Sequence, residues 1–257
     1  MRQRSRVTAK GWARRPRRFS PLAVAGMTLG VLAVLALMLA GLGAQWGWWN
    51  FRTGFRILRW AAYGGAFAAL VSLLGAMHAR PAGPRRGFAI AMVGLLVGLV
   101  AVGLPWQWQR TARSVPPIHD ITTDTENPPE FAAILPLRAN APNPVEYGGP
   151  ELAAQQRAAY PDVQPVLLEM PLDLAFDRAL DAARSMRWEI VSADSAAGRI
   201  EATDRTFWFG FADDVVIRVT PAGGGSRLDA RSISRVGGSD VGTNARRLRR
   251  YLDRVRQ

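Results

Sequence analysis

The chain has 257 residues, of which 33 are Lys or Arg and 20 are Asp or Glu, so its formal net charge is +13. Cysteine is absent and only two histidines occur, which excludes thiol nucleophiles, disulfides, cysteine-rich zinc sites and iron–sulfur ligation. Lys10 is the only lysine, so lysine-based covalent catalysis is excluded outside the N-terminal tail.

The charge is distributed unevenly along the chain. Residues 1–109 carry 14 basic and no acidic side chains, whereas residues 110–257 carry 33 − 14 = 19 basic and all 20 acidic ones. The second part is therefore close to neutral, at 19 − 20 = −1. A basic protein ordinarily suggests a nucleic-acid partner. Here the excess lies where membrane topology requires it, and we expect no nucleic-acid partner.

Three uncharged apolar segments lie between the arginines of the first part, at residues 22–44, 60–79 and 87–109. Each has about 20 residues, enough at about 1.5 Å per residue to cross a hydrocarbon layer of about 30 Å. An arginine at mid-bilayer costs about 2.5–3.5 kcal/mol, so the arginines limit the spans. The pattern predicts three transmembrane helices.

Basic residues and tryptophans predict the orientation of these helices. Eight basic residues precede the first span, three lie between the second and third, and three lie between the first and second. The positive-inside rule therefore places the tail (residues 1–21) and the 80–86 loop in the cytoplasm. Six of the nine tryptophans fall at the opposite span ends, where interfacial aromatic residues are favoured; they are Trp46, Trp48, Trp49, Trp60, Trp106 and Trp108. We therefore predict a bacterial inner-membrane protein with a periplasmic C-terminal domain.

Two features of the spans allow a second interpretation: the first span could be a cleaved signal peptide, and the spaced glycines could join two copies of the chain. Residues 1–44 also have the basic and apolar regions of a cleaved signal peptide, although the apolar region is longer than usual. Glycines recur at four-residue spacing as Gly26 and Gly30, and as Gly94 and Gly98. Such positions let helix backbones approach closely. They favour packing of the three helices within one chain, with a homo-oligomer as the alternative.

Residues 110–165 contain ten of the 17 prolines, so we expect an extended segment interrupted by a short helix at about residues 151–159. A compact domain is expected at residues 166–257. Hydrophobic periodicity there predicts a strand at 166–169, a helix at 172–186, strands at 188–193, 199–207, 215–220 and 227–234, and a final helix.

The final helix and the strand at 215–220 define the expected packing. Apolar residues form one stripe along the helix, at Val241, Ala245, Leu248, Leu252 and Val255. Ser239 or Asp240 is the expected N-cap. In the strand, Val215, Ile217 and Val219 alternate with Val216 and Arg218, as in a sheet with one covered face. The order β-α-β-β-β-β-α predicts an α+β fold whose antiparallel sheet carries both helices on one face.

Several separated segments agree in order with a known family. They are IHDITTD (118–124), RIEATD (199–204), FGFADDVVIR (209–218), and RSISRVG (231–237) leading into DVGTNA (240–245). Over roughly residues 112–257 the chain resembles the domain of unknown function 1499 family, whose members are bacterial and plastid proteins, some membrane-anchored. The resemblance implies a recognised module and brings no established activity, cofactor or catalytic residue.

Two groups of polar residues are candidate sites, and neither is assigned a catalytic role. Arg231, Arg235 and Asn244, with Asp204 nearby, lie around the start of the last helix, where guanidinium groups and free N–H groups suit an anionic ligand. Ion pairing among arginines and nearby carboxylates is the simpler interpretation.

The second group is His119, Asp120 and Asp124, which has ligand types for a divalent cation. Turn and capping roles for these side chains are the alternative. The arginines of the final helix form a basic face that is either solvated or rests on anionic headgroups.

The sequence favours a non-catalytic membrane protein without a cofactor. Its expected partners are the lipid bilayer and an envelope protein, an anionic small molecule or a lipid-like ligand. The alternative is an envelope hydrolase or metal-dependent enzyme that uses His119 and the neighbouring carboxylates.

Overall fold

A computed structural model describes residues 17–257. The predicted basic tail (residues 1–21) lies mostly outside the described residues. The described residues form two compact units: residues 17–38 with 57–104, and residues 39–56 with 105–257. The first unit contains most of three long helices, α1 (Pro21–Gln45), α2 (Phe51–His78) and α3 (Phe88–Ser114).

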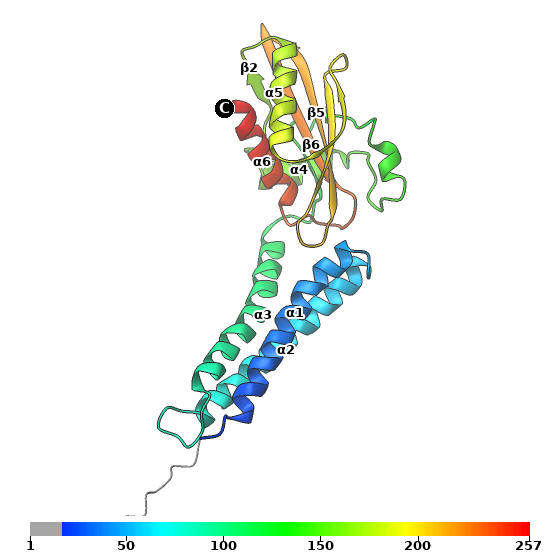
Figure 1. The fold of residues 1–257 in the computed structure, drawn as a ribbon. Helices are drawn as coiled ribbons and strands as arrows, with labels where there is room; N and C mark the ends of the chain where they lie inside the picture. The colour runs from blue at the N-terminus through cyan, green and yellow to red at the C-terminus, as the bar shows by residue number, and fades with distance from the viewer. Residues whose placement is uncertain (1–16) are drawn as a thin grey trace, which may run out of the picture. The chain divides into compact units, whose positions relative to one another are not determined.

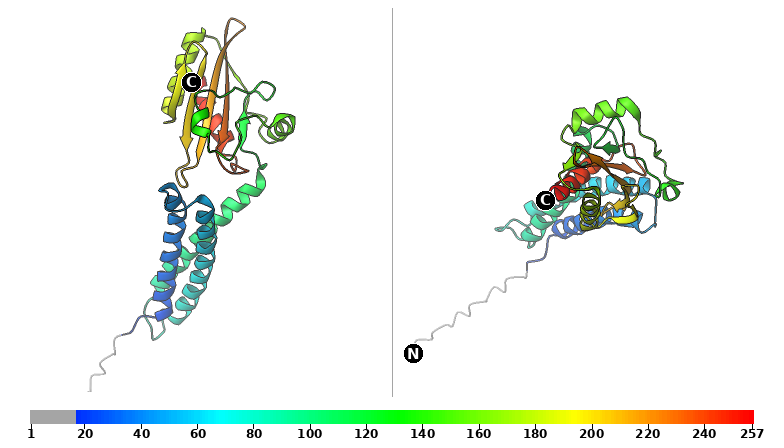
Figure 2. Two further views of the ribbon diagram at one scale, coloured as in Figure 1. Left: turned by 90° about the vertical axis from the view of Figure 1, so that its right-hand side faces the viewer. Right: turned by 90° about the horizontal axis from the view of Figure 1, so that it is seen from above.

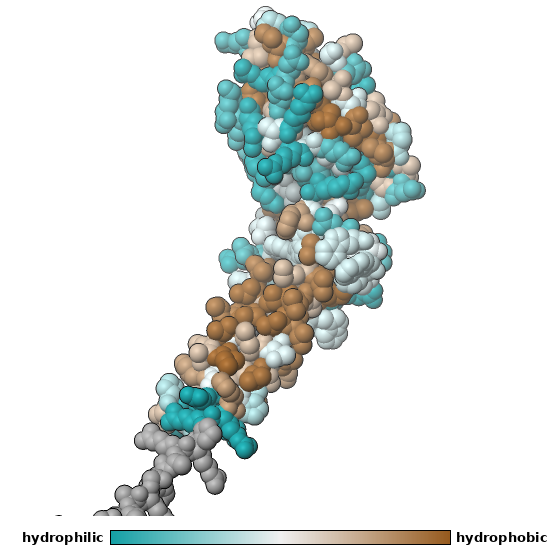
Figure 3. Space-filling view, viewed as in Figure 1, coloured by the Kyte–Doolittle hydropathy of each residue, from teal (hydrophilic) through white to brown (hydrophobic). Residues whose placement is uncertain are grey.

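These three helices are long and apolar enough to cross a membrane, which confirms the three predicted apolar segments. The face of these helices that Figure 3 shows is largely hydrophobic along its middle. Two of them extend beyond the apolar segments: α2 begins at Phe51 rather than residue 60, and α3 ends at Ser114 rather than residue 109. The extension of α2 is possible because its arginines are exposed and because the Asn50 side chain accepts a hydrogen bond from the Thr53 N–H (2.9 Å).

The spaced glycines pack the helices of the first unit against one another. A Cβ atom added at Gly26 would lie 2.7 Å from the Ser72 backbone nitrogen, and one at Gly94 would lie 2.9 Å from Met27. At Gly98 the same atom would lie 2.7 Å from the Gly65 carbonyl oxygen. These glycines are therefore needed for close packing within one chain, and a homo-oligomer built on the same positions would compete with that packing.

The second unit contains an antiparallel sheet whose strands and helices follow the predicted order (Figure 1). The sheet order is β1-β6-β5-β4-β3, and β2 also pairs with β6. The elements after residue 165 are β2 (Val166–Leu168), α5 (Leu172–Ser185), β3 (Glu189–Asp194), β4 (Arg199–Arg205), β5 (Ala212–Ala222), β6 (Gly225–Ser234) and α6 (Thr243–Arg256). The α+β class and the order β-α-β-β-β-β-α over these residues are confirmed.

One face of the sheet packs against α5 and α6, as predicted. Val215, Ile217 and Val219 of β5 lie in one buried cluster with Phe176 of α5 and Leu248 of α6. Val241 does not join the helical stripe, because it lies before α6 with a φ of 54°. The N-cap of α6 is Gly242 with a φ of 72°, and not Ser239 or Asp240 as predicted. Asp240 lies two residues earlier, and its side chain accepts hydrogen bonds from the N–H groups of Gly242 (2.8 Å) and Asn244 (2.6 Å).

The other face of the sheet is covered as well, which the alternation in β5 does not reveal. The proline-rich segment contains β1 (Asp120–Thr122), the short 3-10 helix η1 (Leu135–Arg138) and α4 (Gly149–Ala159). The part around η1 covers this face, whereas Leu152 of α4 packs with the cluster of α5 and α6. Strand β1 pairs with β6, and Phe131 and Ile134 pack on Val216 and Ile233. In Figure 2 (left), the segment with η1 lies in front of the strands and α6 lies behind them. The segment is therefore part of the packed domain and not a free spacer.

Candidate functional site

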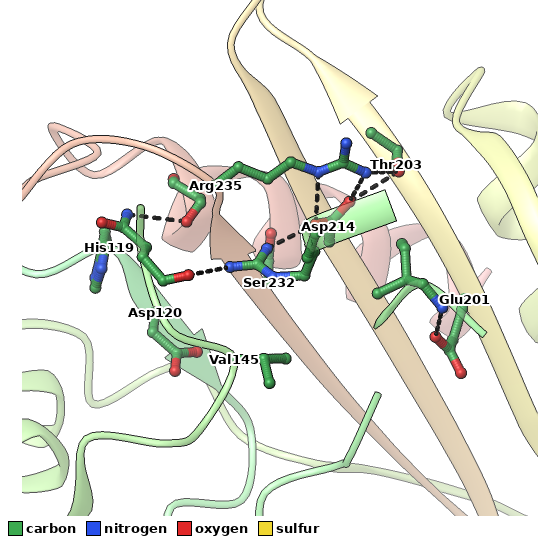
Figure 4. A network of polar contacts seen from close by, with 12 residues as sticks. His119, Asp120, Val145, Glu201, Thr203, Asp214, Ser232 and Arg235 are labelled. Atoms are coloured by element: carbon green, nitrogen blue, oxygen red, sulfur yellow. Dashed lines mark hydrogen bonds and ion pairs between the residues drawn. The ribbon is translucent and has the colours of Figure 1, made fainter. Parts of the chain in front are cut away.

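Charged side chains are buried beneath the segment that covers the second face of the sheet. At their centre is Asp214 of β5, which is fully buried. It accepts hydrogen bonds from Arg235 Nε (2.9 Å) and Nη2 (2.8 Å), from Arg138 Nη1 (2.6 Å), and from the Thr203 hydroxyl (2.8 Å). Figure 4 shows Arg235 reaching both Asp214 and Thr203. The hydrogen bond to Asp214 raises the pKa of Arg235, outweighing the opposing effect of burial.

A second buried pair ties β1 to β6. Arg231 donates from Nε to Asp120 Oδ1 (2.9 Å) and from Nη2 to Oδ2 (2.8 Å), a two-pronged geometry that fixes both side chains. The guanidinium also lies 5.4 Å from the ring centre of Phe131 and 5.5 Å from that of Tyr147. Burial, together with the negative charge of Asp120, raises the pKa of Tyr147 to about 12. Tyr147 is therefore a neutral phenol at physiological pH.

The covering segment is held by a glutamate that the sequence did not single out as a site residue. Glu201 of β4 is fully buried, and its carboxylate accepts hydrogen bonds from the N–H groups of Ala132 (2.9 Å), Ala133 (3.0 Å) and Ile134 (2.9 Å). Arg199 forms an ion pair with the same carboxylate at 3.1 Å. One side chain thus satisfies three successive backbone donors just before η1.

The helix-covered face has its own charged cluster, built around Arg247 of α6. Its guanidinium binds Asp204 (2.8 Å) and Asp213 (2.6 Å), and it also donates to the side-chain oxygen of Asn244. Burial alone would lower the pKa of Arg247, but the charges of Asp213 and Asp204 outweigh it and raise the pKa. Arg247 is therefore not part of a solvated basic face, because it is buried against the sheet.

Strand alternation explains why the two clusters are separate. Successive side chains point to opposite faces of a sheet, so the adjacent Asp213 and Asp214 face different partners. The predicted anion-site residues are divided in the same way. Arg231 and Arg235 lie beneath the covering segment, whereas Asp204 and Asn244 lie on the α6 side with Arg247. The structure does not bring these four residues into one cleft.

The predicted metal ligands are also separated by their hydrogen bonds. Asp120 is occupied by Arg231. Asp124 pairs with Arg227 (2.8 Å) and accepts hydrogen bonds from the backbone N–H groups of the following turn. His119 is bound through its backbone carbonyl, which accepts hydrogen bonds from Asn244 and from the Ser234 N–H. Within residues 17–257, no three His, Cys, Asp or Glu side chains come together as a metal-ligand group.

The result of this packing is an apolar surface around η1, which we call the η1 surface: Ala132, Ala133, Leu135, Pro136 and Leu137. All five residues are exposed, and the side chains of Leu135 and Leu137 are 43% and 53% accessible. Two buried side chains fix the backbone under this surface. Glu201 accepts the hydrogen bond of the Ile134 N–H before η1, and Arg138 at the end of η1 pairs with Asp214. Buried charges therefore fix the position of exposed leucines.

Comparison with known proteins gives the chain a family. A search of curated proteins finds no match to the chain. A family model described as "Protein of unknown function (DUF1499)" matches residues 120–255, from β1 to the last turn of α6. The match includes every strand of the sheet and both helices that cover it. Because it spans more than half of the chain, the protein belongs to the DUF1499 family.

Proposed function

We propose that the protein is a multi-pass protein of the bacterial inner membrane that holds a non-catalytic binding domain on the periplasmic side, with the η1 surface as its contact for an envelope protein. The η1 surface is the observation that supports a binding role. Exposed leucines are held by a buried glutamate and a buried arginine. A surface fixed in advance loses little conformational entropy on binding, which favours a recognition role.

The charge distribution supports the proposed orientation. Residues 1–109 contain 14 basic and no acidic side chains, and 8 + 3 = 11 of the basic ones lie before the first span or between the second and third. Positively charged loops are retained in the cytoplasm. With three crossings, the C-terminal domain is then outside the cytoplasm.

Two reporter fusions after Gln257 test the orientation. An alkaline phosphatase becomes active only after export, and a green fluorescent protein matures to fluorescence only in the cytoplasm. We expect an active phosphatase and a dark fluorescent protein. The opposite pair of results would refute the periplasmic location.

The binding role is tested by a photo-crosslinking amino acid at Leu137 in the full-length protein expressed in its host. We expect a discrete adduct with one envelope protein, and we expect its loss in the Leu135→Ser variant. The matched control is a crosslinker at Leu174, which is 54% exposed on α5 and lies outside the η1 surface. Equal adducts from both positions, or none at Leu137, would refute a specific contact at the η1 surface.

A further inference from the structure

The connection between β4 and β5 is unusually aromatic. Residues 206–211 read TFWFGF, with four aromatic side chains in six positions. The ends are tied together, because the Thr206 N–H donates to the Phe211 carbonyl (2.9 Å) and the Thr206 hydroxyl accepts from the Phe211 N–H (2.9 Å). Gly210 completes the turn with a φ of 65°, a conformation that favours glycine. We call residues 206–211 the aromatic loop.

One side of the aromatic loop packs on helix ends that belong to the same compact unit, residues 39–56 and 105–114. The Phe209 ring lies 5.0 Å from that of Phe55, and the Trp208 ring lies 4.5 Å from that of Trp108. A Cβ atom added at Gly54 would lie 2.8 Å from the Phe209 ring. A Cβ atom added at Gly41 of α1 would lie 2.5 Å from the Trp208 ring. The loop therefore packs on the ends of α1, α2 and α3.

The other side of the loop presents Phe207, whose side chain is 90% exposed. Other exposed aromatic residues occur on the same helix ends, at Trp46, Trp48 and Trp106. These ends also carry basic residues and no acidic ones, with Arg52 and Arg56 at the start of α2 and Arg110 and Arg113 at the end of α3. Exposed aromatic rings beside arginines are the composition found at a bilayer interface.

We propose that the aromatic loop is a fourth contact of the chain with the membrane, and that Phe207 inserts into the interfacial layer of anionic phospholipid next to the helix ends. A largely exposed phenylalanine gains by leaving water, and the boundary between headgroups and acyl chains is where the ring would be buried beside these helix ends. The inference rests on the helices crossing a bilayer, as in the proposed function, but it does not depend on which side the domain occupies.

Because the chain contains no cysteine, a single introduced cysteine can be labelled at one chosen position. Phe207→Cys in the full-length protein is labelled with an environment-sensitive NBD fluorophore and reconstituted into vesicles of phosphatidylcholine and phosphatidylglycerol. Quenching by lipids with a nitroxide at the headgroup or at carbon 5 of the acyl chain is then measured. We expect a blue-shifted emission and quenching several-fold stronger than at the control position.

The matched control is Leu167→Cys, because Leu167 is 73% exposed but lies toward the other end of the sheet. Leu167 of β2 lies opposite Arg227 of β6, and Arg227 lies opposite Thr220 of β5. Strand β5 begins at Ala212, directly after the aromatic loop, so Thr220 is eight residues along the strand from the loop. Eight residues of strand span about 26 Å. The Leu167 label should therefore behave as in water.

A third label, at Trp106→Cys, reports whether the helices are inserted. If the Trp106 label is quenched and the Phe207 label matches the Leu167 control, the membrane contact of the aromatic loop is refuted while the membrane-spanning helices stand. If the Trp106 label is also unquenched, both the insertion of the helices and the inference that rests on it are refuted.

Discussion

Replacement of Glu201 tests whether one buried carboxylate holds the segment that covers the sheet. In Glu201→Gln, one oxygen can still accept from Ala132 and Ala133, but an amide NH₂ group then faces the Ile134 N–H. Leaving a buried donor without a partner costs about 1–3 kcal/mol. For a protein of this size, that corresponds to a fall in melting temperature of about 2–12 °C. Glu201→Ala removes the acceptor of all three N–H groups and should therefore destabilise the domain more than Glu201→Gln.

The assay combines thermal unfolding with hydrogen exchange on the full-length protein in detergent micelles. If the segment opens more easily by about 1–3 kcal/mol, the amides of Ala132, Ala133 and Ile134 should exchange about 5 to 150 times faster in Glu201→Gln. The matched control is Glu189→Gln, the same chemical change at an exposed position of the adjacent strand. Control-like melting and unchanged exchange at these amides in Glu201→Gln would refute the anchoring role.

Three further changes test the core, the α6 cluster and the buried Asp240 before α6 in the same micelles. Leu248→Asp places a charge at a fully buried position of the main core and should abolish cooperative unfolding of the domain; retained near-ultraviolet circular dichroism would contradict the packing. Arg247→Ala leaves Asp213 buried without its cation and should cost about 3–5 kcal/mol, measured by melting, whereas exposed Arg250→Ala should cost less than about 0.5 kcal/mol. Burial raises the pKa of Asp240, so its protonated form is favoured in the folded state and its contribution to stability falls as pH rises through the folded pKa. Melting from about pH 3 to about pH 7 should therefore show wild type losing stability relative to Asp240→Asn; parallel curves would contradict this.

Local patterns predicted most of the chain's elements. The apolar segments, the strands after residue 165 and the stripe on α6 follow from periodicity alone, because each depends on neighbours within one element. The orientation in the membrane follows from charge and remains a prediction. The limits of α2 and α3 were less accurate, since exposed arginines end an apolar segment without ending the helix that contains it.

The candidate sites could not be predicted in the same way. Arg231, Arg235 and Asn244 are close in sequence, which suggested a shared anion site, with ion pairing to carboxylates as the simpler interpretation; the structure shows both arginines in ion pairs. Alternation of the strand and the position of α6 instead separate them onto different faces. The arginines also have carboxylate partners far away in the chain, as in the pair of Arg231 and Asp120, which are 111 residues apart.

Composition and periodicity by themselves determined that three helices are apolar enough for a membrane and that an α+β sheet follows them. Only the tertiary structure decided what covers the second face of that sheet. Glu201 accepts its three backbone hydrogen bonds from residues 67 to 69 positions earlier, in a stretch with no periodic pattern. A buried charge requires partners, but no local rule states where in the chain those partners lie.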